Sequence, residues 1–130
     1  MKTPKIVVHA DVVLDHLLHG EKGPSILRIA MKKYLCYTTV VNAMELFSYG
    51  TSGRYIGIIQ DALGAMKILG VNSRNAKNFG LLMRRYPRCT MTDLLVAGIC
   101  LESNLPLLTI ARERFSGIKR LNLVEPASLG

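Results

Sequence analysis

The chain alternates short apolar runs with longer stretches in which apolar residues recur at helical spacing. Apolar runs of this length, bounded by polar or turn residues, are typical of strands buried on both faces. We expect strands at residues 5–9, 36–39, 107–109 and 121–124. We expect helices in the stretches between them, at residues 12–19, 24–35, 40–49, 54–69, 72–86 and 93–103.

Capping residues predict several of the helix boundaries. Asp11 and Thr92 are expected to cap the helices that follow them, because short polar side chains accept hydrogen bonds from the free N–H groups of a first helical turn. Gly20 is expected to end the first helix. Two glycines within residues 54–69 either weaken that helix or permit another helix to approach it closely.

The alternation of elements favours an α/β fold, since parallel strands are joined by crossover helices that cover both faces of a sheet. We expect a three-layer α/β/α arrangement around a mostly parallel central sheet of about four or five short strands. No repeat, low-complexity segment or long linker divides the 130 residues, so residues 1–130 are expected to form a single domain.

Composition excludes disordered and membrane-spanning proteins. Apolar residues make up 49% of the chain and charged residues 20%, as in ordered globular proteins. No run approaches the ~20 apolar residues of a membrane-spanning helix, and His9 and Asp11 interrupt the first apolar run too early for a secretory signal. Cys36, Cys89 and Cys100 fit no zinc-binding spacing, which indicates reduced thiols in a cytoplasmic protein.

Net charge is +8, from 17 Lys and Arg against 9 Asp and Glu. This balance favours a phosphate-rich or acidic partner, although simple solubility charge is the alternative. The basic residues gather in two segments, at Arg74, Lys77, Arg84, Arg85 and Arg88 and at Arg112, Arg114, Lys119 and Arg120. The RNA-contacting candidates among them are Arg84, Arg85, Arg88 and Arg112. Such side chains either track a nucleic-acid backbone or form an ordinary solvated surface.

Three acidic residues stand where a site is expected. Asp11 follows the first strand, Glu45 lies one turn into the helix after the second strand, and Asp93 starts the helix at residues 93–103. Polar groups at the carboxyl ends of parallel strands converge on one crevice. Carboxylates in apolar surroundings are costly to bury unless they are paired, hydrogen-bonded or metal-bound. Their convergence would favour Mg²⁺ or Mn²⁺, which prefer carboxylate oxygens.

Each carboxylate also has a simpler interpretation. Asp11 and Asp93 can be helix-start residues that the helix dipole and the free N–H groups stabilise. Glu45 gains no such advantage in mid-helix between Met44 and Leu46. An ion pair with an arginine is the alternative explanation for Glu45.

Four segments in a fixed order resemble the PIN domain found in the toxins of bacterial and archaeal toxin–antitoxin pairs. They are His9-Ala10-Asp11-Val12-Val13-Leu14-Asp15, Thr38-Thr39-Val40-Val41-Asn42-Ala43-Met44-Glu45-Leu46, Thr92-Asp93-Leu94-Leu95-Val96-Ala97-Gly98-Ile99-Cys100-Leu101 and Leu105-Pro106-Leu107-Leu108-Thr109, with Phe115 nearby. The resemblance covers the chain from Lys5 to Pro126.

The resemblance implies three or four acidic residues that hold Mg²⁺ or Mn²⁺ and hydrolyse single-stranded RNA, an antitoxin partner and a homodimer. Glu45 and Asp93 match two of the family's acids, whereas His9 and Ala111 fall on two others. If residues 9 and 11 are both extended they lie on one face, so that Asp11 supplies the missing carboxylate. The implied catalytic set is His9, Asp11, Glu45 and Asp93, with the three carboxylates as metal ligands and His9 favouring Mn²⁺.

Two functional hypotheses follow from the residues and the resemblance. One is a metal-dependent endoribonuclease of toxin type. The alternative is a catalytically impaired PIN domain that acts as an RNA- or protein-binding module. A phosphorylated receiver domain is excluded, because Asp61 lies inside an expected helix and no aspartate ends a middle strand.

Overall fold

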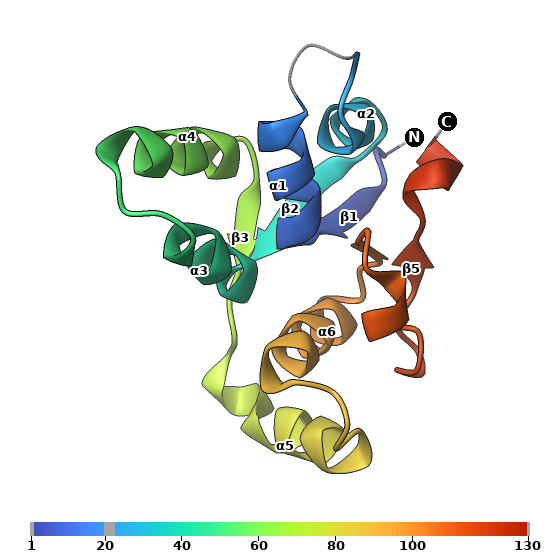
Figure 1. Ribbon diagram of the computed structural model, residues 1–130. Coiled ribbons are helices and arrows are strands. Elements are labelled where there is room, and N and C mark those ends of the chain that lie inside the picture. The colour runs from blue at the N-terminus through green and yellow to red at the C-terminus, as the bar shows by residue number, and fades with distance from the viewer. Residues whose placement is uncertain (1, 20–22, 130) are drawn as a thin grey trace.

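The computed structural model describes residues 2–19 and 23–129 (Figure 1). Its strands are β1 (Lys5–Val8), β2 (Leu35–Thr39), β3 (Lys67–Leu69), β4 (Leu107–Leu108) and β5 (Leu123–Val124). Its α-helices are α1 (Ala10–Leu18), α2 (Ile26–Lys33), α3 (Val40–Ser48), α4 (Gly53–Gly64), α5 (Ala76–Arg85) and α6 (Met91–Ser103). Three short 3₁₀ helices are η1 (Ser73–Asn75), η2 (Arg112–Arg114) and η3 (Pro126–Leu129).

The five strands form one sheet in the order β3-β2-β1-β4-β5, and every neighbouring pair is parallel. This confirms the expected α/β fold with a parallel sheet of short strands. The central strand β1 pairs with β2 on one side and with β4, which comes much later in the chain, on the other. The sheet order therefore changes direction at β1, and crevices for ligands form beside the carboxyl ends of strands at such a point.

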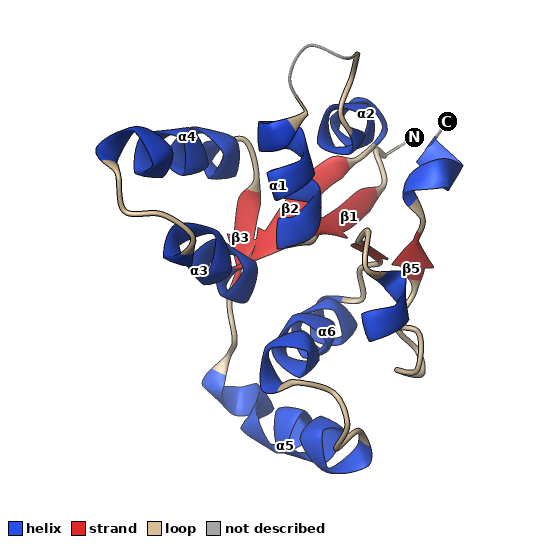
Figure 2. Ribbon diagram, viewed as in Figure 1, coloured by secondary structure: helices blue, strands red, loops and turns tan. Residues whose placement is uncertain are grey.

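Helices cover both faces of the sheet (Figure 2). Ile6 and Val8 of β1 point into a core formed with α1, α2 and α4, whereas Val7 points into a second core formed with α5, α6 and the segment around Phe115. Alternation of side chains along a strand explains why consecutive residues enter different cores. All three residues are fully buried, as the short apolar run predicted.

Close packing of α5 on α6 depends on Gly98. A Cβ atom at this position would lie 2.2 Å from Cε1 of Phe79. The glycine therefore lets the Phe79 ring lie directly on the backbone of α6.

The expected helix at residues 54–69 is wrong in its second half. The helix α4 ends at Gly64, and the residues after Met66 form the edge strand β3, which pairs with β2. Glycine is a poor helix former, and Met66 buries its side chain between the two elements. The expected helix at residues 72–86 likewise begins as η1 and becomes α-helical only at Ala76.

Two expected caps are also wrong. His9 rather than Asp11 is the N-cap of α1, and Thr90 rather than Thr92 is the N-cap of α6, where its hydroxyl accepts from the Asp93 N–H at 3.1 Å. Gly20, expected to end the first helix, lies outside the described residues. No helix in the described part of the chain is long and apolar enough to cross a membrane.

Candidate functional site

The candidate site lies beside the carboxyl ends of β1 and β4. His9 directly follows β1, and Thr109 directly follows β4, its hydrogen-bonded neighbour in the sheet. The two elements that carry Glu45 and Asp93 also reach this end, since α3 directly follows β2 and contacts both α1 and α6. Parallel strand ends thus bring together residues that lie far apart in the sequence.

Asp11 fastens the loop after β4 to the first turn of α1. Its Oδ2 accepts from the Thr109 hydroxyl at 2.7 Å and from the Ala111 N–H at 3.2 Å, and its Oδ1 accepts from the Ile110 N–H at 3.2 Å. Asp11 is helical, so the expectation that residues 9 and 11 are both extended is wrong. Ala111, which stands at a family acid position, contributes its backbone to this loop.

The pKa of Asp11 lies below its ordinary value of 3.8. Burial raises this pKa, but the nearby His9, the Thr109 hydroxyl and the Ile110 N–H together lower it by more. Hydrogen bonds donated to a carboxylate favour its charged form. Asp11 is therefore held as an anion by the loop that it fastens.

His9 is committed to capping α1. Its Nδ1 accepts from the Asp11 N–H at 3.0 Å, and its ring meets that of Phe115 edge-on at 5.5 Å between centroids. The same Nδ1 lies 3.4 Å from Oδ2 of Asp11. The Nδ1 lone pair of His9 is thus already used within the chain.

Asp93 is paired with Arg114. The Arg114 Nε donates to Oδ2 of Asp93 at 3.1 Å, and its terminal Nη2 donates to Oδ1. The Asp93 side chain is only 5% exposed, whereas that of Arg114 is 40% exposed. A buried carboxylate is stable here because a bidentate guanidinium neutralises both of its oxygens.

Glu45 is half-buried, and its carboxylate bonds to an exposed tyrosine. Its Oε2 accepts from the Tyr49 hydroxyl at 3.0 Å, one turn further along α3. Its neighbours Met44 and Phe47 are exposed, whereas Leu46 is buried, so the apolar sequence around Glu45 is only partly buried. Burial and the bond to Glu45 raise the pKa of the Tyr49 hydroxyl.

The charges of all three carboxylates favour the protonated form of Arg114. The pKa of Arg114 is raised first by its hydrogen bonds to Asp93 and, through space, by the charges of Asp93, Glu45 and Asp11. Of the three carboxylates, Asp93 is the one to which the Arg114 guanidinium is hydrogen-bonded.

These residues do not fit a divalent ion in this arrangement. Among residues 2–19 and 23–129, no group of three His, Cys, Asp or Glu side chains is placed to hold a metal. Asp93 gives both oxygens to Arg114, Asp11 gives both to the loop, and His9 uses its Nδ1 as a cap. A cation such as Mg²⁺ needs oxygen ligands that are free to face it.

The role of Arg114 was not predicted from the sequence. Arg114 belongs to a basic segment that could contact a phosphate backbone, yet its side chain pairs with Asp93. Arg112, an RNA-contacting candidate, forms an exposed ion pair with Glu125. The other candidates, Arg84, Arg85 and Arg88, are exposed at the end of α5 and in the turn that leads to α6.

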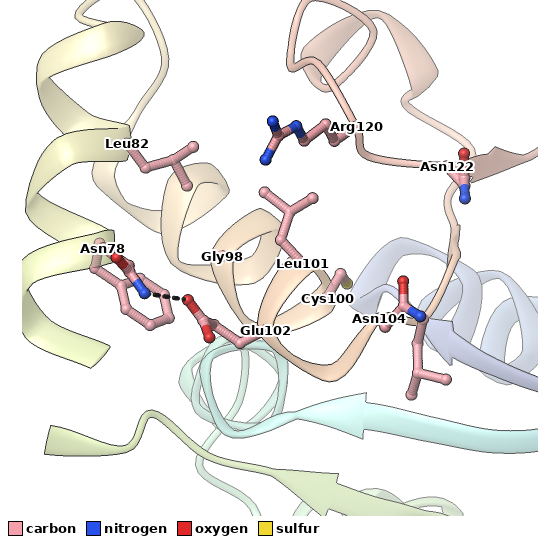
Figure 3. Close-up of a pocket in the computed structure, with 11 residues that line it drawn as sticks. Asn78, Leu82, Gly98, Cys100, Leu101, Glu102, Asn104, Arg120 and Asn122 are labelled. Carbon is pink, nitrogen blue, oxygen red and sulfur yellow. Dashed lines mark hydrogen bonds between the residues drawn. The ribbon is translucent and has the colours of Figure 1, made fainter. Parts of the chain in front are cut away.

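A cavity between α5 and α6 lies away from these carboxylates. It has a volume of about 450 Å³ and is lined by Asn78, Phe79, Leu82, Gly98, Cys100, Leu101, Glu102, Asn104, Leu105, Arg120 and Asn122. Asn78 of α5 donates to Oε1 of Glu102 of α6 at 3.0 Å across it (Figure 3). Asp11, Glu45 and Asp93 do not line this cavity.

The protein has a three-layer α/β/α fold of the kind found in PIN domains. Three solved complexes match it over almost its whole length. VapBC2 from Rickettsia felis bound to a promoter DNA fragment is 16% identical, with 92% of this chain and 97% of that chain covered and a TM-score of 0.78. DNA-bound VapBC from Salmonella typhimurium is 14% identical, with 95% and 98% covered and a TM-score of 0.79.

VapBC-1 from nontypeable Haemophilus influenzae is 16% identical, with 94% and 98% covered and a TM-score of 0.77. The matched chains are the VapC toxin components of these complexes, which are PIN domains. No family model matches the sequence, and no curated protein matches it either. The resemblance to PIN domains is confirmed at the level of the fold.

Proposed function

We propose that this protein is a toxin-type PIN domain, spanning residues 1–130, that is catalytically impaired and acts by binding an antitoxin-like protein. The observation that carries this proposal is the bidentate pair between Asp93 and Arg114. Metal-dependent hydrolysis needs a carboxylate that is free to hold and orient the metal. A protein partner is supported by the structural neighbours, which are toxin–antitoxin complexes.

An apolar groove between α1, α2 and α4 suits such a partner. The groove has a volume of about 340 Å³ and is lined by His16, Leu17, Leu27, Met31, Ile58, Asp61, Ala62 and Ala65. Met31 and Ile58 are exposed within it. Apolar side chains that line a groove between helices accept the apolar face of a partner helix.

Ile58→Glu is expected to abolish binding of a partner in this groove, because a carboxylate would be buried without a counter-charge. The probe is the product of a short reading frame directly upstream of the gene, co-expressed with this chain. Ile68→Glu is the matched control, since Ile68 is similarly exposed but lies on the edge strand β3. If both variants lose binding equally, or if neither loses it, the partner does not bind in this groove.

A metal-dependent endoribonuclease acting on single-stranded RNA is the second candidate function. It is favoured by the positions of Asp11 and Glu45 on the helices that follow β1 and β2, and by that of Asp93 on α6, which contacts α3. The exposed Arg84 and Arg88, which precede α6 and Asp93, would then hold the phosphate backbone. This function requires Arg114 to leave Asp93.

RNA cleavage separates the two candidates. We expect the wild-type chain to leave single-stranded RNA intact in Mg²⁺ and in Mn²⁺, and Glu45→Gln and Asp93→Asn to behave like the wild type. The measurement is the fraction of labelled RNA cut over a metal titration. Metal-dependent cleavage by the wild type that both variants lose would reject the impaired site and favour the ribonuclease.

Two further parts of the proposal rest on the resemblance and the composition. The chain forms a homodimer, which light scattering of the purified protein checks. It works in the cytoplasm, in keeping with Cys36, Cys89 and Cys100, which are free thiols.

A further inference from the structure

We infer that the cavity between α5 and α6 is a binding site for a guanine nucleotide, taken either as the free nucleoside monophosphate or as a guanosine within an RNA strand. In this site Arg120 binds the phosphate and Glu102 binds the base. The site is separate from Asp11, Glu45 and Asp93, and it stands whether or not the proposed function holds.

The backbone of the cavity wall carries the first sign of a site. Among the residues that the structure describes, the two non-glycine residues with positive φ both line this cavity: Asn104 at 54° and Arg120 at 70°. Asparagine tolerates the left-handed conformation, and Asn104 uses it to end α6. Arginine is strained in this conformation. Residues strained in this way concentrate at ligand-binding and catalytic sites.

The loop that carries Arg120 is held on both sides. The Lys119 N–H donates to the Tyr86 hydroxyl at 2.9 Å, which fastens the loop to the end of α5. On the other side, the Leu107 N–H donates to the Asn122 carbonyl at 2.9 Å, where β4 pairs with β5. Arg120 therefore faces the cavity from a fixed loop, as a preorganised binding group does.

The Arg120 guanidinium is available to a ligand. The side chain points into the space between α5 and α6 (Figure 3), and within the described part of the chain it forms no ion pair. A guanidinium binds two phosphate oxygens through parallel hydrogen bonds. The neighbouring Lys119 adds positive charge, so a phosphate is the group that this end of the cavity attracts.

Glu102 lies across the cavity from Arg120 and is also unfavourably placed (Figure 3). It belongs to the last turn of α6, where the helix dipole disfavours a negative charge. Its Oε1 accepts from Asn78 at 3.0 Å, which leaves Oε2 for a ligand. A carboxylate accepts hydrogen bonds and donates none, so the ligand group that faces Glu102 carries N–H donors. Local rules are broken in this way chiefly at functional sites.

The size and the walls of the cavity fit a nucleotide. Its volume of about 450 Å³ falls among small-molecule sites, which span about 300–1,000 Å³, and exceeds what a phosphate ion alone needs. Leu82 and Leu101 flank the space between Arg120 and Glu102 (Figure 3). Apolar side chains suit the flat faces of a base, whose polar edge is then read by hydrogen bonds.

The acceptor at Glu102 selects the base. Guanine presents two neighbouring N–H donors on its Watson–Crick edge, and the two oxygens of a carboxylate can bind both. Adenine, cytosine and uracil each place an acceptor beside their donor, and this acceptor would face the carboxylate unfavourably. Guanine is therefore the base that fits.

Calorimetry in metal-free buffer of low ionic strength tests the site with guanosine 5′-monophosphate and with a ribotrinucleotide that has guanine at its centre. The adenine counterparts and inorganic phosphate are the ligand controls. We expect both guanine ligands to bind at least about tenfold more tightly than their adenine counterparts, as for a bidentate contact to a base. The tighter of the two identifies the source of the nucleotide. Without metal the trinucleotide stays intact, so the result does not depend on whether the chain is a ribonuclease.

Arg120→Gly separates binding from folding. Glycine adopts a positive φ without strain, so we expect this variant to melt at or above the temperature of the wild type while its affinity for both guanine ligands falls at least about tenfold. Lys119→Gln is the matched control, because it removes the same charge from the next residue, which does not line the cavity. It should weaken binding much less. Glu102→Gln keeps an acceptor for Asn78 and should remove the preference for guanine over adenine.

The inference is overturned if neither guanine ligand binds the wild type, or if adenine ligands or inorganic phosphate bind as tightly. It is also overturned if Arg120→Gly keeps the affinity of the wild type, if Lys119→Gln loses as much affinity as Arg120→Gly, or if Glu102→Gln still prefers guanine. The proposed function fails on other measurements, namely partner binding in the groove and metal-dependent cleavage of RNA.

Discussion

Arg114→Gln is expected to lower the free energy of unfolding by about 3 kcal/mol in metal-free buffer, the lower end of the range for a broken buried ion pair. The substitution leaves the Asp93 carboxylate, 5% exposed, without its counter-charge. Substitution of the partner, Asp93→Asn, should lower the free energy of unfolding much less. In Asp93→Asn the Arg114 side chain, already 40% exposed, can turn into water. We expect a loss of about 1 kcal/mol there, mostly from the helix-start charge.

Denaturant unfolding followed by circular dichroism measures both values. Arg112→Gln serves as the control, because its ion pair with Glu125 has side chains that are 56% and 47% exposed. Exposed pairs of this kind contribute about 0–1 kcal/mol. If Asp93→Asn destabilises the protein as much as Arg114→Gln does, the asymmetry of burial does not govern this pair, and Arg114 is not the charge that makes burial of Asp93 tolerable.

The elements that carry the three carboxylates could be predicted from the sequence, but the partners of these carboxylates could not. Their positions after strands and at helix starts follow from the general rule for parallel sheets. Which counter-charge they meet depends on a loop contact, since Arg114 lies 21 residues beyond Asp93. Nothing in the sequence separates Arg114 from Arg112, which stands two residues earlier and turns outward to Glu125.

The fold was predictable where hydrophobic periodicity was strong and failed where elements are short. The buried strand β1 and the helices α3 and α6 lie close to their expected bounds. The edge strand β3 was missed because its three residues continue the apolar pattern of α4 and take their structure from pairing with β2. The environment of Glu45 was misjudged for a related reason. Apolar residues on a helix can face solvent, as Met44 does with 59% of its surface exposed.

Asp11→Ala is expected to lower the free energy of unfolding by about 2 to 4 kcal/mol, because three hydrogen bonds from the loop after β4 would lose their acceptor. The Ile110 and Ala111 N–H groups would then rely on water for partners. The control is Asp61→Ala on α4, an exposed aspartate for which we expect a change within about 0.5 kcal/mol. Equal effects of the two substitutions would show that the loop is held by other contacts.

The same carboxylate should give the protein part of its acid sensitivity. The pKa of Asp11 is below its ordinary value in the folded chain, so the folded state binds this proton less readily than the unfolded state. Its contribution to stability is therefore complete above about pH 4 and is lost as the pH falls below 3.8 and through the lowered folded-state pKa. Unfolding curves over this range should converge for wild type and Asp11→Ala. A constant difference between the two down to the lowest pH would mean that Asp11 stabilises the fold by packing alone, with no part played by its charge.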